Sequence, residues 1–233
     1  MRNSFKPIVL TLLLATTCTA FGAGGGEMPN RSSGSASRLD SAKETPEEKA
    51  RNAYNAGVRL VQKADELSVD AAHQADERKK AKGRDKAQQT YTSAMKKFTS
   101  ATELAPTDFQ AWNYLGYTYR KLGQYDVALA AYDRSLKLQP NYANAIEYRG
   151  HAYLGLNRLD DAKAAYLALF AGNRKLAATL LAAMQEWVSD RRSNAAGIDG
   201  NTLESFASWV SERNTIASQT ASLTREGAAA AWH

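Results

Sequence analysis

Large apolar residues recur at steps of three and four from about residue 47 onwards, which is the spacing of one face of an α-helix. Near the middle of the chain, Trp112, Leu115 and Tyr119 follow this spacing. Helix-ending residues such as Gly123 and Pro140 divide the apolar segments from one another. A half-buried strand would need alternating apolar and polar residues, and no segment alternates convincingly. The pattern therefore predicts an all-α chain of helices joined by short turns.

Two consecutive windows of about 34 residues, 109–142 and 143–174, repeat one design. Small residues stand where two helices must approach closely, and aromatic or aliphatic residues stand on the inner faces. Gly123 ends the first helix of the first window, and Asn157, which also tolerates a left-handed backbone, takes the same place in the second. The residues that carry the repeated design are Trp112, Leu115, Gly116, Tyr119, Ala128, Tyr132, Pro140, Gly150, Tyr153, Ala162 and Tyr166.

This design resembles the tetratricopeptide repeat (TPR), whose signature is Trp-x2-Leu-Gly-x2-Tyr, followed by Ala, an aromatic residue and Pro. The resemblance implies an all-α TPR helical-hairpin solenoid with C-terminal capping helices. It also implies a concave groove, lined by the first helices of the repeats, that binds another protein or a peptide. Carried over by position, the groove residues are Gln110, Asn113, Tyr117, Arg120, Asn144, Glu147, His151 and Leu154. Each of them, taken singly, could instead be an ordinary solvated surface residue.

Some TPR domains hold the C-terminal carboxylate of a peptide with Lys, Arg and Asn side chains at set groove positions. In this chain those positions are occupied by Tyr54, Val58, Tyr114, Asn144 and Tyr148. The resemblance therefore does not extend to that carboxylate clamp.

An irregular unit, residues 47–108, precedes the two regular windows. Its second-helix half ends near Pro106, but the matching first-helix half, around Gly57, lies much further upstream than a regular repeat allows. The insertion between the halves, roughly residues 64–86, has a helix-forming composition. It is expected to lengthen both helices into a longer hairpin.

Apolar residues at helical spacing also follow the last repeat. Residues 175–190, with Leu180, Met184 and Trp187, form the expected capping helix of the array. Residues 191–233 form the expected C-terminal helical extension. The whole TPR domain is thus expected to cover residues 47–190.

The N-terminus reads as a secretory signal peptide, residues 1–22, because basic residues precede a short apolar run and small residues follow it. A Gly/Ser-rich linker, residues 23–46, is expected to be disordered. We therefore expect a periplasmic or secreted protein, cleaved between Ala20 and Ala23 and without stable membrane insertion. The alternative is an outer-membrane lipoprotein of a pilus or secretion assembly, anchored through Cys18.

The charge balance is mildly basic, because removal of Arg2 and Lys6 with the signal peptide lowers the formal net charge from +6 to +4. This value does not indicate nucleic-acid binding. Contact with an anionic surface is one interpretation of the basic run at residues 78–86, and a solvated loop at the tip of the helical hairpin is the favoured one.

Residues suited to catalysis or metal binding are scarce. The three histidines, His73, His151 and His233, are not spaced as metal ligands, and Cys18 is the only cysteine. No cofactor, metal site or catalytic residue is therefore predicted. A catalytic domain would have to lie within residues 172–233, which are too few. The sequence favours an exported, non-catalytic TPR scaffold of the cell envelope that binds another protein.

Overall fold

The computed structural model describes residues 44–194 and 197–230. Within these ranges the chain forms eight helices and no strands, which confirms the predicted all-α class. The signal peptide predicted at residues 1–22 and nearly all of the predicted linker lie outside the described residues. The helices are α1 (Pro46–Ala72), α2 (Glu77–Leu104), α3 (Phe109–Lys121), α4 (Tyr125–Leu138), α5 (Ala143–Gly155), α6 (Leu159–Gly172), α7 (Arg174–Ser193) and α8 (Gly200–Ala230).

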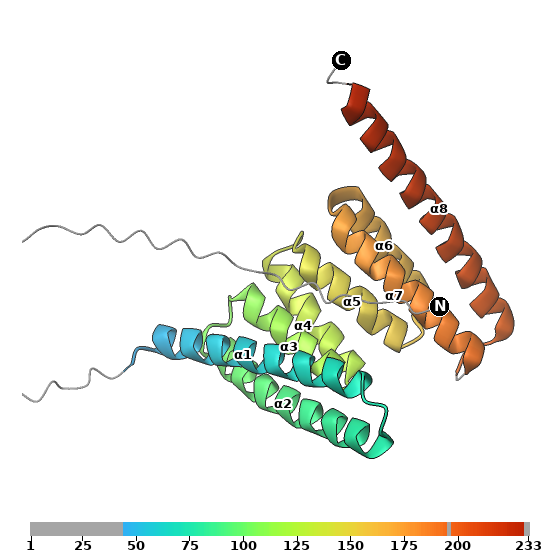
Figure 1. The fold of residues 1–233 in the computed structure, drawn as a ribbon. Coiled ribbons are helices and arrows are strands. Elements are labelled where there is room, and N and C mark those ends of the chain that lie inside the picture. Colours follow the sequence, from blue (N-terminus) through green and yellow to red (C-terminus); the bar gives the residue numbers. More distant parts are fainter. Residues whose placement is uncertain (1–43, 195–196, 231–233) are drawn as a thin grey trace, which may run out of the picture. The chain divides into compact units, whose positions relative to one another are not determined.

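Consecutive helices pair into four hairpins, α1 with α2, α3 with α4, α5 with α6 and α7 with α8 (Figure 1). The first helix of each later hairpin also packs on both helices of the hairpin before it. Each hairpin thus buries its apolar face against its neighbours in sequence, which is the arrangement of a solenoid. The structure confirms the predicted helical-hairpin solenoid.

Local signals in the sequence determine where several helices begin and end. The Thr45 hydroxyl accepts a hydrogen bond from the Glu48 backbone N–H, and the Glu48 carboxylate accepts one from the Thr45 N–H, which completes a capping box. Gly123 and Asn157 adopt left-handed backbone with φ of +76° and +56°. Both residues end a first helix, as the repeat predicts.

Small residues let the two helices of a hairpin approach closely. A Cβ atom placed on Gly116 would lie 2.6 Å from the Tyr132 ring, and one on Gly57 would lie 2.7 Å from Phe98. In the third hairpin, Gly150 faces Leu180 of α7 at 2.6 Å. Two further small residues of the repeat, Ala128 and Ala162, are fully buried. The repeated small residues are therefore contact points between helices.

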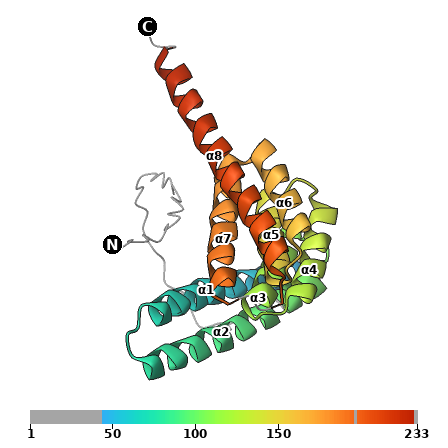
Figure 2. The ribbon, with the colours of Figure 1, turned by 90° about the vertical axis from the view of Figure 1, so that its right-hand side faces the viewer.

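The first hairpin is about twice as long as the regular ones, because α1 and α2 have 27 and 28 residues where α3 and α4 have 13 and 14 (Figure 2). The insertion thus lengthens both helices, as its composition predicts. The turn between them is residues 73–76. The basic run at residues 78–86 is therefore not a loop but the first turns of α2, because Asp76 caps the helix by accepting the Lys79 N–H.

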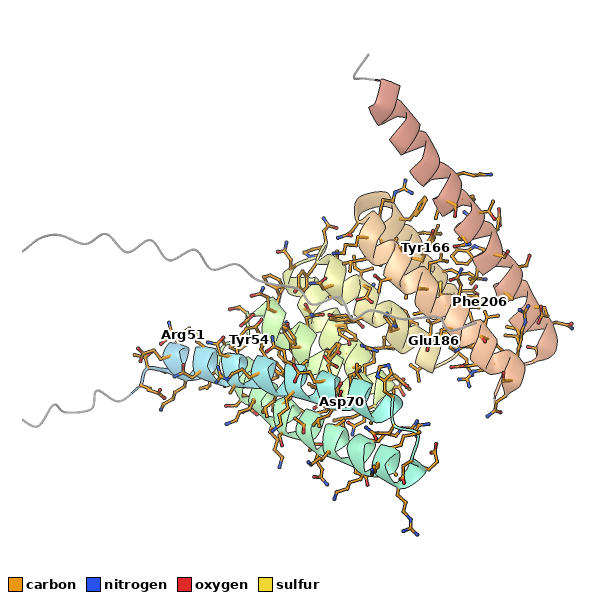
Figure 3. All side chains as sticks on the ribbon, in the orientation of Figure 1. Arg51, Tyr54, Asp70, Tyr166, Glu186 and Phe206 are labelled. Atoms are coloured by element: carbon orange, nitrogen blue, oxygen red, sulfur yellow. The ribbon has the colours of Figure 1, made fainter. Side chains whose placement is uncertain are left out.

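The last two helices form a hairpin that shares one hydrophobic core with the third hairpin. Leu180 and Met184 of α7 are fully buried, and Trp187 meets Phe206 of α8 edge to face at 5.4 Å between ring centroids. Tyr166 and Phe206, labelled in Figure 3, lie in this core. In the described ranges, no helix has an apolar stretch long enough to span a bilayer.

Candidate functional site

The first helices α1, α3 and α5 bring a group of polar and aromatic side chains together. We call this group the first-helix face. Its members are Asp65, Tyr117, Arg120, Lys121, Glu147, Tyr148 and His151. Asp65 belongs to α1, the next three residues to α3, and the last three to α5. All three elements lie on consecutive hairpins, so the face follows the path of the solenoid.

The Asp65 carboxylate is the hydrogen-bonding centre of this face. Its oxygens accept bonds from the Tyr117 hydroxyl at 2.7 and 2.9 Å and from the Tyr91 hydroxyl of α2. The Lys121 ammonium lies 3.3 Å away. Burial lowers the pKa of Lys121, and the negative charge of Asp65 opposes this shift. Asp65 therefore joins the long first hairpin to α3.

The Arg120 guanidinium lies over two tyrosine rings, 5.0 Å from the centroid of Tyr117 and 5.6 Å from that of Tyr148. Burial disfavours its charge, but Tyr132, Tyr117 and Glu147 act in the opposite sense and raise the pKa of Arg120 overall. It is therefore cationic at neutral pH. Its Nε atom is buried and has no hydrogen-bond partner in the part of the chain that the structure describes. Arg120 as a whole is only partly buried, so an acidic group of a ligand would bind at the outer part of the guanidinium.

Glu147 and His151 form a pair one turn apart on α5. The His151 Nε2 atom lies 2.6 Å from the Glu147 carboxylate, which is almost fully buried. Among the described residues Glu147 forms no salt bridge with Arg120, although its charge helps to raise the pKa of Arg120. The guanidinium thus retains its capacity for another carboxylate.

The structure places the predicted groove residues in two different environments. Gln110 and Asn144 are exposed, whereas Tyr117, Arg120 and His151 are partly buried. Asn113 and Glu147, which occupy equivalent positions in successive repeats, are buried at 1% and 4% exposure. Leu154, the last of the predicted groove residues, is also buried. Each first helix packs against the next one, so these buried residues lie beneath the surface and cannot contact a partner directly.

Sequence reasoning missed Asp65, Lys121 and Tyr91 as members of the polar network. Asp65 and Tyr91 are close only because the first hairpin is lengthened, and the insertion does not match the family pattern that assigns groove positions. One signal was present in the sequence. Asp65 directly follows Ala64 on the buried side of α1, and a carboxylate beside a buried position generally has a hydrogen-bond partner.

Other features of the described residues do not support catalysis. No group of three or more His, Cys, Asp or Glu side chains in the described ranges could hold a metal ion. An open pocket between α6 and α8 is lined by Asn157, Asp160, Lys163, Asn201, Thr202 and Phe206. Its lysine is already paired with Asp160 at 3.1 Å. The first-helix face is therefore the stronger candidate site.

The tyrosines around this face titrate abnormally. Burial raises the pKa of Tyr91, Tyr117, Tyr132 and Tyr148 well above the ordinary value of 10.0. Above pH 10 the unfolded chain therefore loses protons that the folded chain retains. The free energy of unfolding must then fall as pH rises.

We expect the protein to unfold cooperatively in alkali, with stability falling above pH 10 by about 1.4 kcal/mol per pH unit for each buried tyrosine. Urea unfolding between pH 8 and 12 and tyrosinate absorbance measure this effect. The variant Tyr132→Phe should reduce the slope, because the fully buried Tyr132 is one of the shifted groups. Tyrosinate absorbance that rises near pH 10 while the chain stays folded would contradict the burial of these hydroxyls.

The stacked hairpins and their repeated small-residue contacts define a helical repeat protein. Residues 109–142 match the family model described as tetratricopeptide repeat. The family match is thus confined to one repeat, residues 109–142, which the sequence pattern also identifies as a tetratricopeptide repeat. Repeats of this class characteristically form binding surfaces for other proteins.

Comparisons with other proteins add little to this assignment. A search of curated protein sequences finds no match. The second TPR domain of human RPAP3, solved in complex with an HSP70 peptide, is 20% identical, with 59% of this chain and 96% of that chain covered and a TM-score of 0.44. The first TPR domain of human RPAP3 is 18% identical, with 60% and 98% covered and a TM-score of 0.42. The MamA RS-1 ArsTM double mutant is 22% identical, with 71% and 94% covered and a TM-score of 0.38.

Proposed function

We propose that this chain is a non-catalytic scaffold that binds an acidic segment of another protein on its first-helix face. The observation that carries the proposal is the state of Arg120. Its guanidinium is cationic, lies over the rings of Tyr117 and Tyr148, and forms no salt bridge in the described part of the chain. A carboxylate from a partner would form a charge-assisted hydrogen bond with it.

The surroundings of Arg120 favour a protein segment as the ligand. Further along the same helices, the exposed amide side chains Gln110 and Asn144 lie at the beginnings of α3 and α5 and can hydrogen-bond a peptide backbone. Tyr117 and Tyr148 pack at 5.1 Å between ring centroids and offer aromatic surface beside the cation. Aromatic and arginine side chains contribute most of the binding energy in many protein interfaces.

We further propose that the scaffold acts in the cell envelope after export as a periplasmic or secreted protein. The apolar run that follows Arg2 and Lys6 supports this proposal. Mass spectrometry of the mature N-terminus tests it. A free amino terminus between residues 21 and 24 is expected. An acylated Cys18 would favour the anchored assembly factor, and an intact Met1 would contradict export.

Selection of peptides by the full chain tests the binding proposal. Peptides enriched from a random display library should contain Asp or Glu, and the variant Arg120→Met should bind them at least about 10-fold more weakly. The matched control is Arg134→Met, because Arg134 also lies over an aromatic ring, Trp112, but belongs to α4.

The control variant should retain the affinity of the unchanged chain. Thermal melting of both variants separates loss of binding from loss of folding. Equal affinity of Arg120→Met and the unchanged chain, or enrichment of peptides without acidic residues, would contradict the proposed site.

A further inference from the structure

The side of α2 that faces away from its neighbours carries two groups of cations, one in the first ten residues of the helix and one about ten residues further along. The buried residues Ala87, Tyr91, Ala94 and Phe98 mark the inner side of the helix. At about 100° per residue, Arg78, Lys82 and Lys96 fall on the opposite side and Lys79, Lys86 and Lys97 on one flank beside it, whereas the exposed Arg84 falls on the other flank. We call the first six of these residues the basic stripe: Arg78, Lys79, Lys82, Lys86, Lys96 and Lys97. Figure 3 shows long side chains projecting from this free side of α2.

The charge of the protein is concentrated on this helix. It carries eight Lys and Arg residues against three Asp and Glu residues, whereas the whole chain has a formal net charge of +6. The neighbouring helix α1 differs, because acidic residues such as Glu66 and Asp70 interrupt its exposed basic residues. The stripe is therefore a property of α2 alone within the first hairpin.

Helix stability does not explain the stripe. Arg78 and Lys79 lie in the first turn of α2, where the helix dipole disfavours positive charge. On this helix, Lys80 forms a salt bridge with Glu77. No stripe residue forms a salt bridge within residues 44–194 or 197–230. The stripe cations therefore remain available to an external anion.

We propose that the basic stripe binds the surface of an anionic lipid bilayer, with α2 lying flat against the headgroups. From Arg78 to Lys97 the stripe extends about 28 Å along one straight helix, at about 1.5 Å per residue. A planar anionic surface contacts all six side chains at once. Five of the six are lysines. Their side chains are flexible and end in a compact charge, so they can pair with lipid headgroups that are not held in a fixed arrangement.

The composition of the stripe argues against other partners. The residues between its cations are polar or small, among them Asp85, Gln89 and Ser93. A specific protein interface would need aromatic or apolar anchors, and a single-stranded nucleic acid would need stacking rings. The apolar side of α2 is already used in the core, so the helix adsorbs to a bilayer without entering it. This surface is separate from the first-helix face.

Vesicle sedimentation with the full chain tests the proposal. Binding should be strong on vesicles of phosphatidylglycerol mixed with phosphatidylcholine, weak on phosphatidylcholine alone, and lost as salt is raised. The neutral vesicles also measure any contribution from the apolar residues near the N-terminus. The triple variant Lys82→Gln, Lys86→Gln, Lys96→Gln should lower the anionic partition coefficient on the order of 100-fold.

A matched control removes three exposed cations from α1, by Arg51→Gln, Arg59→Gln and Lys63→Gln, and should retain most of the binding. Replacing the same three stripe lysines with arginine should also retain the binding. This variant keeps the charge, so it distinguishes a loss of charge from a loss of folding. The proposal is overturned if both triple glutamine variants lose binding equally. Equal binding to both vesicle types, or binding to duplex DNA without binding to anionic vesicles, would overturn it as well.

Discussion

Replacement of Gly116 with leucine should lower the free energy of unfolding by about 3 kcal/mol. The reason is steric, because even a Cβ atom at this position would lie 2.6 Å from the ring of Tyr132, which is itself fully buried. Leucine is the better helix former by about 1 kcal/mol, but α3 and α4 would have to separate to admit it. Urea unfolding gives the change directly. The melting temperature should fall by roughly 6–12 °C.

The matched control for this prediction is Gly172→Leu at the end of α6. A Cβ atom at Gly172 meets nothing within 4 Å, so this variant should be nearly as stable as the unchanged chain. Ala128→Trp, on the helix that faces Gly116, should be destabilising for the same reason, because Ala128 is fully buried. Equal melting temperatures for Gly116→Leu and Gly172→Leu would contradict the close packing of α3 on α4.

Replacement of Asp65 with alanine should cost about 2–4 kcal/mol. The change removes the acceptor of two tyrosine hydroxyls, those of Tyr91 and Tyr117, and the counterion of Lys121. Tyr91 is almost fully buried, and its hydroxyl would keep only the Ser68 hydroxyl, 3.4 Å away, as a partner. Asp65→Asn keeps an oxygen acceptor and should cost less. Chemical unfolding of both variants measures the difference.

Asp70→Ala is the control for the same helix, because Asp70 is exposed (Figure 3). It should change stability by no more than about 0.5 kcal/mol. The double variant Asp65→Ala, Tyr117→Phe should lose less free energy of unfolding than the sum of the losses of the two single variants, because both changes remove the same hydrogen bond. If Asp65→Ala were as stable as Asp70→Ala, the network would contribute nothing to the attachment of α3 to the first hairpin.

The burial of Asn113 and Glu147 shows that a family pattern does not predict how deeply each groove residue is buried. The repeat predicts which side of a first helix faces the groove, because that depends only on residue spacing along one helix. How deeply each residue is covered depends on how closely the next first helix approaches. Gly150 illustrates this, since it meets Leu180 of α7 and not the aromatic residue of its own hairpin.

The sequence alone determined the helical class, the repeat register and several helix ends, because each depends on residues close together in the chain. The left-handed backbone of Gly123 and Asn157 is of this kind. The tertiary structure alone decided that Asp65 meets Tyr117, across 52 residues of sequence. Such a contact depends on the length of the first hairpin and its alignment with α3, and no local spacing encodes either of them.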